Sequence, residues 1–275
     1  MEKLKTVSAK AAILPLALML LAFAACGSGG DNSQSKPVDM AWVPGGSFQM
    51  GSASGRDSDE RPVHTVTLSG FWMGRHEVTQ GQYHALMGGN PASGYGVGND
   101  YPVYYVSWYD AVRFCNALSE QEGLAKAYTV NGTNVTWNQN ADGFRLPTEA
   151  QWEYAAKGGD GSPGNYTYSG SDNVGDVAWY SSNSGSGTHA VGTKAPNGLG
   201  IYDMSGNVWE WCWDWYGSYS SEAQTAPQGA SSGSYRVSRG GDWSYPAGYI
   251  RSAYRDLGSS PSSRNYGVGF RVVRP

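Results

Sequence analysis

Two segments of the chain show the apolar periodicity of an amphipathic helix. Between residues 109 and 118, apolar side chains recur at spacings of three and four residues, at Ala111, Phe114, Cys115 and Leu118. Between residues 148 and 156 the pattern is similar, and Thr148 with Gln151 has the spacing of a capping box. Two glycines at 158 and 159 then end this second segment. The pattern therefore predicts two short helices.

Most other apolar residues fall in short strand-like runs between clusters of Gly, Asn, Ser and Pro. Residues 42–50 and 64–68 are such runs, and 269–273 is expected to be the closing strand. The clearest run is 209–215, where alternation puts four tryptophans on one face and Glu210, Cys212 and Asp214 on the other. We expect the tryptophan face to belong to the core rather than to a ligand box, because buried Trp contributes a large apolar area.

The segment 158–190 consists almost entirely of Gly, Ser, Asn, Asp and Tyr and is expected to be loop. Its Trp179-Tyr180 pair suggests that this loop folds back onto the body of the domain. Together the patterns predict an α+β domain in which two short helices pack on a small, twisted, mostly antiparallel sheet with extensive ordered loops.

The N-terminal segment has the pattern of an export signal. Lysines at positions 3 and 5 precede an apolar stretch from Ala11 to Ala25, which is short for a membrane-spanning helix. Phe23-Ala24-Ala25-Cys26 resembles a bacterial lipobox, with Phe in place of the usual Leu. We expect a signal peptide at 1–25, a lipidated Cys26 on a flexible tether at 26–37, and one domain at 38–275. The alternative is an ordinary secretory signal with an incidental cysteine.

Composition narrows the class of partner. Charged residues make up 15% of the chain, against roughly 25% in an average globular protein. The difference is filled by 11 Trp, 19 Tyr and 39 Gly. A net charge of -4 without basic clusters argues against nucleic acid as a partner. Once Cys26 is lipidated, Cys115 and Cys212 remain, and they are either a disulfide or two buried thiols.

A set of segments, in this order along the chain, resembles the formylglycine-generating enzymes of the sulfatase-modifying factor family. These segments are Val43 to Gly51, Arg61 to His64, Glu77 to Thr79, Tyr101 to Val103 with Val106 to Trp108, Arg145 to Ala155, Asn197 to Trp211, and Arg239 to Gly241 with Gly269 to Arg271. The resemblance covers nearly all of residues 38–275 and implies a variant of the C-type lectin fold.

The same resemblance implies that catalysis is lost. Enzymes of this family oxidise a substrate cysteine with two cysteines of their own, placed shortly after the Gly-Gly, and these thiolates bind copper. Here no cysteine follows Gly241, and Cys212 precedes that segment. The histidines at 64, 76, 84 and 189 lack the spacing of a metal-binding helix. Glu149 and Glu153, on one helix face, are expected to be scaffold. We therefore expect no copper and no enzyme activity.

One metal site is implied by the resemblance. Family members hold calcium at the turn that enters the Trp-rich strand, and position by position this gives the side chains of Asp203 and Glu210 with the backbone carbonyls of Gly206 and Val208. Some relatives have Asn where this chain has Asp203, and both supply an oxygen ligand. The alternative is that the metal is gone and Glu210 forms a salt bridge with an arginine.

The C-terminal segment carries a narrower resemblance, to exported treponemal variable lipoproteins that retroelements diversify by copying adenines with errors. It rests on Gly240 to Trp243, Arg251 to Arg255, Pro261, Arg264, and Gly269 to Arg271. Asparagine codons mutated at their adenines cannot encode Lys, Glu, Gln, Met or Trp, and none of these five occurs from Ser244 to Gly267. A surface loop rich in Gly and Ser would also contain few of them.

The variable segment, about 243–268, implies a ligand-binding patch between fixed motif residues. Its candidate positions are Ser244, Tyr245, Pro246, Gly248, Tyr249, Tyr254, Asp256, Leu257, Gly258, Asn265, Tyr266 and Gly267. Tyr with Ser, Gly and Asn is also the composition of antibody binding loops. Four arginines, at 251, 255, 264 and 271, are expected to be structural rather than a site for an anionic ligand.

We therefore expect an exported protein, anchored by lipid to the outer membrane at the cell surface, that binds a protein or glycan on another cell or on a host. An invariant adaptor lipoprotein is the first alternative, and a divergent oxidase of the formylglycine-generating class is the second.

Overall fold

A computed structural model describes residues 38–160 and 165–275. The expected signal peptide, Cys26 and the tether lie outside the described residues. In the described part of the chain, no helix is both long and apolar enough to cross a bilayer. The fold is α+β, with short helices, small sheets and long ordered loops, as the sequence predicts.

Three small sheets and one hairpin replace the single sheet expected from the sequence. The first sheet has the order β1-β4-β11 and the second β10-β7-β9, while the third is β2-β3-β8 and β5 pairs with β6. Most pairings are antiparallel, but β10 runs parallel to β7 and β8 parallel to β3. The strands are β1 (Met40–Val43), β2 (Gly46–Met50), β3 (His64–Leu68), β4 (Phe71–Gly74), β5 (Tyr128–Asn131), β6 (Asn134–Trp137), β7 (Trp209–Trp215), β8 (Gln224–Thr225), β9 (Arg236–Arg239), β10 (Val268–Gly269) and β11 (Val273–Arg274).

Both predicted helices are present, as α2 (Trp108–Gln121) and α3 (Glu149–Ala156). Thr148 caps α3 with the expected capping box. The sequence analysis missed α1 (Gln80–Met87) and the one-turn α4 (Val174–Val177). Helix α1 has little apolar periodicity, but Thr79 and Gln82 form a capping box that gives its start. Short 3-10 turns are also present, at Ser58–Glu60 and Ala247–Tyr249.

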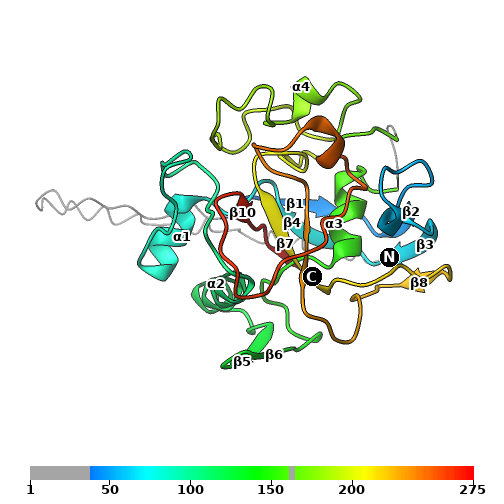
Figure 1. The fold of residues 1–275 in the computed structure, drawn as a ribbon. Coiled ribbons are helices and arrows are strands. Elements are labelled where there is room, and N and C mark those ends of the chain that lie inside the picture. Colours follow the sequence, from blue (N-terminus) through cyan, green and yellow to red (C-terminus); the bar gives the residue numbers. More distant parts are fainter. Residues whose placement is uncertain (1–37, 161–164) are drawn as a thin grey trace, which may run out of the picture. The chain divides into compact units, whose positions relative to one another are not determined.

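Strand β7 lies between two hydrophobic cores in the middle of the domain (Figure 1). Trp209 and Trp211 belong to a first core with α2 and Phe270, as expected for the tryptophan face. Cys212, on the other face, belongs to a second core that packs α3 against β1 and β4. Both faces of β7 are therefore buried, and the polar face predicted from the alternation does not meet solvent.

Glu210 on the buried polar face of β7, and Glu149 and Glu153 on α3, are paired with arginines from the C-terminal part of the chain. Arg271 Nε lies 2.6 Å from Glu210 on β7. Arg271, Arg239 and Arg255 are each at most 2% exposed. The other two pairs are Arg239 with Glu153 at 2.5 Å and Arg255 with Glu149 at 2.7 Å. A buried charge must be paired, so these contacts fix the positions of β9, α3 and the chain end.

The closing strand predicted at 269–273 is wrong as a continuous element. It is broken into β10, which pairs with β7, and β11, which pairs with β4. Between them the chain crosses from one sheet to the other, and Arg271 turns inward to Glu210. The loop 158–190 does fold back, because the Trp179 carbonyl accepts a hydrogen bond from Asn207 and Trp179 bridges Gly206.

Replacing Arg239 with Ala is expected to lower the free energy of unfolding by about 3–5 kcal/mol, because it leaves Glu153 buried with a weaker set of partners. Urea denaturation of the purified chain measures this change. Lys126→Ala is the matched control, since Lys126 forms an exposed pair with Glu120 and should change stability by less than about 1 kcal/mol. Equal effects of the two substitutions would contradict the structural role of the buried pair.

Candidate binding surface

The variable segment begins at a tight turn after β9. Gly240 and Gly241 both have positive φ, and a Cβ at Gly241 would lie 2.2 Å from Ile250, so the turn requires glycine. Asp242 follows and is 3% exposed. Its carboxylate accepts hydrogen bonds from the backbone and hydroxyl of Ser244, both at 2.7 Å, and burial raises its pKa to about 6. A buried, hydrogen-bonded residue thus supports the first exposed loop.

Ten of the twelve candidate positions are at least partly exposed. Leu257 is 71% exposed, Tyr245 37% and Tyr266 36%. Two positions are buried: Tyr254, which packs against the first core, and Gly267, whose Cα lies close to the Asp242 carboxylate. The expectation that Tyr254 lies on an exposed face is therefore wrong, because its ring lies over Trp209 on β7.

Aromatic rings of this segment form two clusters, within each of which the rings contact one another. Tyr249 contacts Tyr245 and Tyr254 at centroid distances of 5.6 and 5.2 Å, and Tyr245 contacts Trp209 at 5.5 Å. Tyr266 belongs to a second cluster, described below. Burial, Asp242 and Asp256 raise the pKa of Tyr245. We call Tyr245, Tyr249 and Tyr266 the tyrosine patch.

Three residues next to the patch were not found by sequence reasoning. Tyr95 stacks on Trp243 at 5.2 Å and contacts Tyr266 at 5.0 Å, which completes the second cluster. The Arg56 guanidinium lies 4.2 Å from the Tyr249 ring centre, and Tyr235, 51% exposed, lies beside Gly258. Tyr95 and Arg56 are more than 140 positions away in the sequence, so no local motif points to them.

The arginines of the segment are structural, as the sequence analysis expects. Each of the four forms a salt bridge with a carboxylate elsewhere in the chain: Arg251 with Glu60 at 2.5 Å, Arg255 with Glu149 at 2.7 Å, Arg264 with Asp110 at 2.8 Å and Arg271 with Glu210 at 2.6 Å. These pairs hold the loops between them at fixed points. They do not present a cluster of unpaired cations to an anionic ligand.

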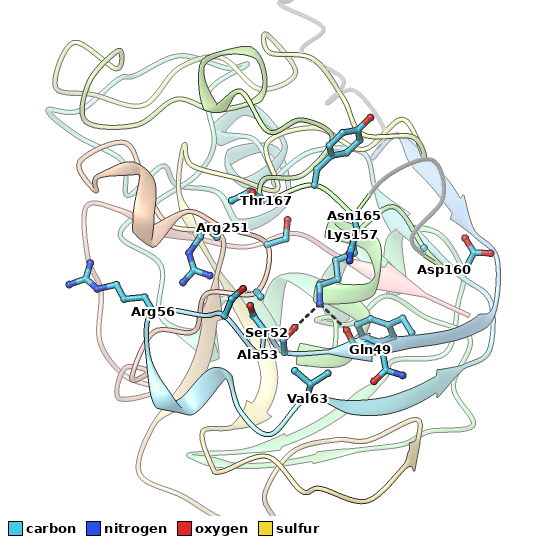
Figure 2. Close-up of a pocket in the computed structure, with 17 residues that line it drawn as sticks. Gln49, Ser52, Ala53, Arg56, Val63, Lys157, Asp160, Asn165, Thr167 and Arg251 are labelled. Atoms are coloured by element: carbon cyan, nitrogen blue, oxygen red, sulfur yellow. Dashed lines mark hydrogen bonds between the residues drawn. The ribbon is translucent and has the colours of Figure 1, made fainter.

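A cleft of about 870 Å³ lies beside the patch, between the end of β2, the end of α3 and residues 251–253. Figure 2 shows the Lys157 ammonium reaching toward β2, where it donates to the carbonyls of Gln49 and Gly51 at 2.8 and 3.0 Å. Arg56 and Arg251 line the side of the cleft that borders the patch. Since Lys157 also pairs with Glu153, the cations of this cleft are mostly neutralised.

The two cysteines are free and fully buried. Cys115 belongs to the first core and Cys212 to the second, so the unpaired-thiol alternative holds. Burial raises the pKa of both thiols. Because the thiolate is the reactive and metal-binding form, neither cysteine is suited to nucleophilic or copper chemistry.

The expected calcium residues lie at one buried turn, in which Asp203 and Asn207 have positive φ. Asp203 Oδ2 accepts from the Gly192 amide at 2.7 Å, while Oδ1 has no partner among the described residues. Burial raises the pKa of Asp203 to about 6. An unpartnered, buried carboxylate oxygen fits a calcium ligand.

Both carboxylate oxygens of Glu210, the second expected calcium ligand, already have partners within the protein. Its two oxygens accept from Arg271 at 2.6 Å each, and Trp152 donates to one of them at 2.8 Å. This is the arginine salt bridge of the alternative interpretation, although a cation can share a carboxylate with a guanidinium. Within the described residues, no group of three or more His, Cys, Asp or Glu is arranged to hold a metal. Any ion here would need the carbonyls of Gly206 and Val208.

The comparisons with known proteins agree with the fold described above. The model of the sulfatase-modifying factor enzyme 1-like domain matches residues 28–275. The chain belongs to this family. It is 40% identical over 251 residues to the chaperone protein LppX of Paenibacillus barcinonensis, covering 80% of this chain and 82% of that protein. It is 32% identical to the formylglycine-generating enzyme of Thermomonospora curvata, covering 85% and 92%.

Among solved structures, Treponema denticola variable protein 1 is similar with a TM-score of 0.78 and 38% identity, covering 86% of this chain and 95% of that one. The chain is thus similar both to a formylglycine-generating enzyme and to a variable protein. After Gly241 it has Asp242, Trp243, Ser244 and Tyr245 and no cysteine.

Calcium is expected to raise the melting temperature of the full chain, because an ion that binds only the folded state stabilises it by mass action. Thermal unfolding in a chelator and in millimolar-range calcium measures the shift. Asp203→Asn should keep most of the shift and Asp203→Ala should lose it. Asn is the matched control because it tolerates positive φ and retains an oxygen. No shift in the unmodified chain would exclude the site.

Proposed function

We propose that this chain is an exported lipoprotein that binds a protein or glycan ligand through the tyrosine patch, on a scaffold that has lost the oxidase chemistry of its family. The observation that carries the proposal is that the segment 244–267 holds several large aromatic rings at the surface. Tyr245 and Tyr266 are 37% and 36% exposed, and Tyr249 is half-buried. Soluble proteins rarely expose such a surface unless it binds something.

The scaffold beneath the patch supports a binding role. Tyrosine has few rotatable bonds and loses little entropy on contact, so a patch of tyrosines binds well when its backbone is held still. Here the segment is fixed at Arg251 and Arg255, which are ion-paired to Glu60 and Glu149, while the buried Asp242 accepts from Ser244 within the turn. Side chains between these points can change without altering the buried pairs.

Similarity to a treponemal variable protein supports diversification of this segment. The candidate positions lie between the paired arginines, and most are exposed, so they are the positions where substitutions cost least stability. An invariant adaptor would instead keep one surface in all copies. Comparison of residues 244–267 among sibling genes, with a search for a neighbouring error-prone template repeat, distinguishes these two alternatives.

Tyr245→Ala and Tyr249→Ala are each expected to weaken binding by about 1–4 kcal/mol, because central tyrosines of an interface act as hot spots. Affinity is measured on a printed glycan array and on a panel of purified extracellular proteins. Tyr166→Ala is the matched control, since Tyr166 is 39% exposed and lies outside the patch. Binding that survives both patch substitutions would contradict the proposal.

The lipid anchor is tested on the mature protein. We expect detergent-extracted protein to begin at a diacylated Cys26, as seen by mass spectrometry, and Cys26→Ala to release the chain from membranes. An unmodified N-terminus would exclude the anchor and leave the ordinary secretory signal.

The oxidase alternative predicts turnover of a sulfatase-type cysteine peptide. We expect none from purified, copper-loaded protein, because the segment after Gly241 lacks cysteine and both remaining thiols are buried with raised pKa values. A formylglycine product, detected by mass spectrometry and absent without copper, would restore the enzymatic interpretation.

A further inference from the structure

A pair of exposed tryptophans lies on the sheet formed by β1, β4 and β11. Trp42 and Trp72 are directly opposite each other in the register of β1 and β4, and their ring centroids are 5.4 Å apart. They are 47% and 36% exposed. The other nine tryptophans of the chain are buried or half-buried. Trp42 and Trp72 are therefore a contacting pair that remains exposed, although the domain buries or half-buries its other tryptophans.

The fold explains why these rings face outward. Ala41 and Val43 alternate with Trp42 along β1 and belong to the second core, as do Phe71 and Met73 on either side of Trp72. The inner face of the sheet is thus the core face and the tryptophans are on the other. Arg274 on β11 is opposite Trp72 in register, and its guanidinium lies 5.8 Å from the Phe144 ring centre.

The position of the pair in the sequence indicates what covers it. Cys26 lies 16 residues before Trp42 (42 − 26 = 16) and 12 residues before Val38 (38 − 26 = 12), where the domain begins. Twelve extended residues span at most about 40 Å. A lipid at Cys26 would therefore limit how far Val38 can lie from the membrane surface.

We propose that Trp42 and Trp72 form a membrane-docking surface that enters the headgroup region of the bilayer in which Cys26 is anchored. Tryptophan is enriched at this interface because its ring is apolar and its N–H is polar. The inference rests on the proposed lipid anchor but is independent of what the patch binds. It makes the sheet face a second contact, so that the tether is not the only link to the membrane.

Docking through this face leaves the tyrosine patch free. Tyr245 and Tyr254 contact Trp209, which projects from the face of β7 opposite Cys212. Cys212 belongs to the second core, which also holds the inner face of β1 and β4. The second core and β7 thus lie between the tryptophan pair and the patch. One surface can contact lipid while the other contacts a ligand.

The test uses the full lipidated chain in vesicles of phosphatidylcholine and phosphatidylglycerol, with part of the phosphatidylcholine brominated near the headgroup. Bromine quenches tryptophan fluorescence only at short range. We expect brominated lipid to quench the wild-type protein and expect most of this quenching to be lost in Trp42→Phe/Trp72→Phe. Trp179→Phe is the control, because it removes a half-buried tryptophan from another part of the surface and should leave the quenching unchanged.

Flotation of the vesicles separates the anchor from the docking surface. Protein that floats but shows the same quenching in wild type and the double variant overturns the docking proposal and leaves the anchor standing. Protein that does not float overturns the anchor and the docking that rests on it. Sedimentation in detergent supplies the third arm. If the wild type is a dimer and the double variant a monomer, a second copy covers the pair, which also overturns the proposal.

Discussion

The buried ion pairs between arginines and carboxylates hold together segments that are far apart in the sequence. Arg239, Arg255 and Arg271 come from the last forty residues, and their partners lie on α3 and β7. Desolvated charges are costly unless paired with good geometry, so one arrangement of these segments is strongly favoured over others. In a domain with short strands and long loops, these pairs supply constraints that an extended sheet would otherwise provide.

This arrangement places side chains with fixed and with free roles next to each other. Along the segment that follows Gly241, Asp242, Arg251 and Arg255 point into the domain and are fully engaged, whereas Tyr245, Tyr249 and Leu257 between them reach the surface. A substitution at an engaged position leaves a buried partner unsatisfied. A substitution at a surface position changes mainly what the protein can contact. The two classes differ in whether the side chain has a buried partner, and this difference requires no special loop conformation.

Aromatic rings occupy the start of the segment that follows Gly241. Trp243 packs under Tyr95 and Tyr266, and its indole N–H has no partner among the described residues. Thiol chemistry with copper requires exposed thiolates, and the two cysteines that remain in the domain are enclosed in separate cores.

The sequence alone determined the elements whose signals are local. The apolar spacing of 109–118 and the capping box at Thr148 specify helices, and the alternation of 209–215 specifies a strand, because each depends only on neighbouring residues. The order of motifs gave the family, and the missing cysteines after Gly241 could be read directly. Local pattern could not show that both faces of β7 are buried, since Glu210 and Asp214 look like a solvated face until Arg271 and α3 cover them.

Tertiary structure alone decided which distant residues meet. Tyr95 and Arg56 join the patch, and Trp42 meets Trp72, through chain crossings that no spacing encodes. It also decided that Tyr254 is buried while Tyr245 is exposed, although both are tyrosines in the same variable segment. Both rings contact Trp209, but Tyr254 belongs to the first core and is also covered by Tyr249 and the Arg251 guanidinium. Contacts between residues far apart are set by the packing of the whole chain.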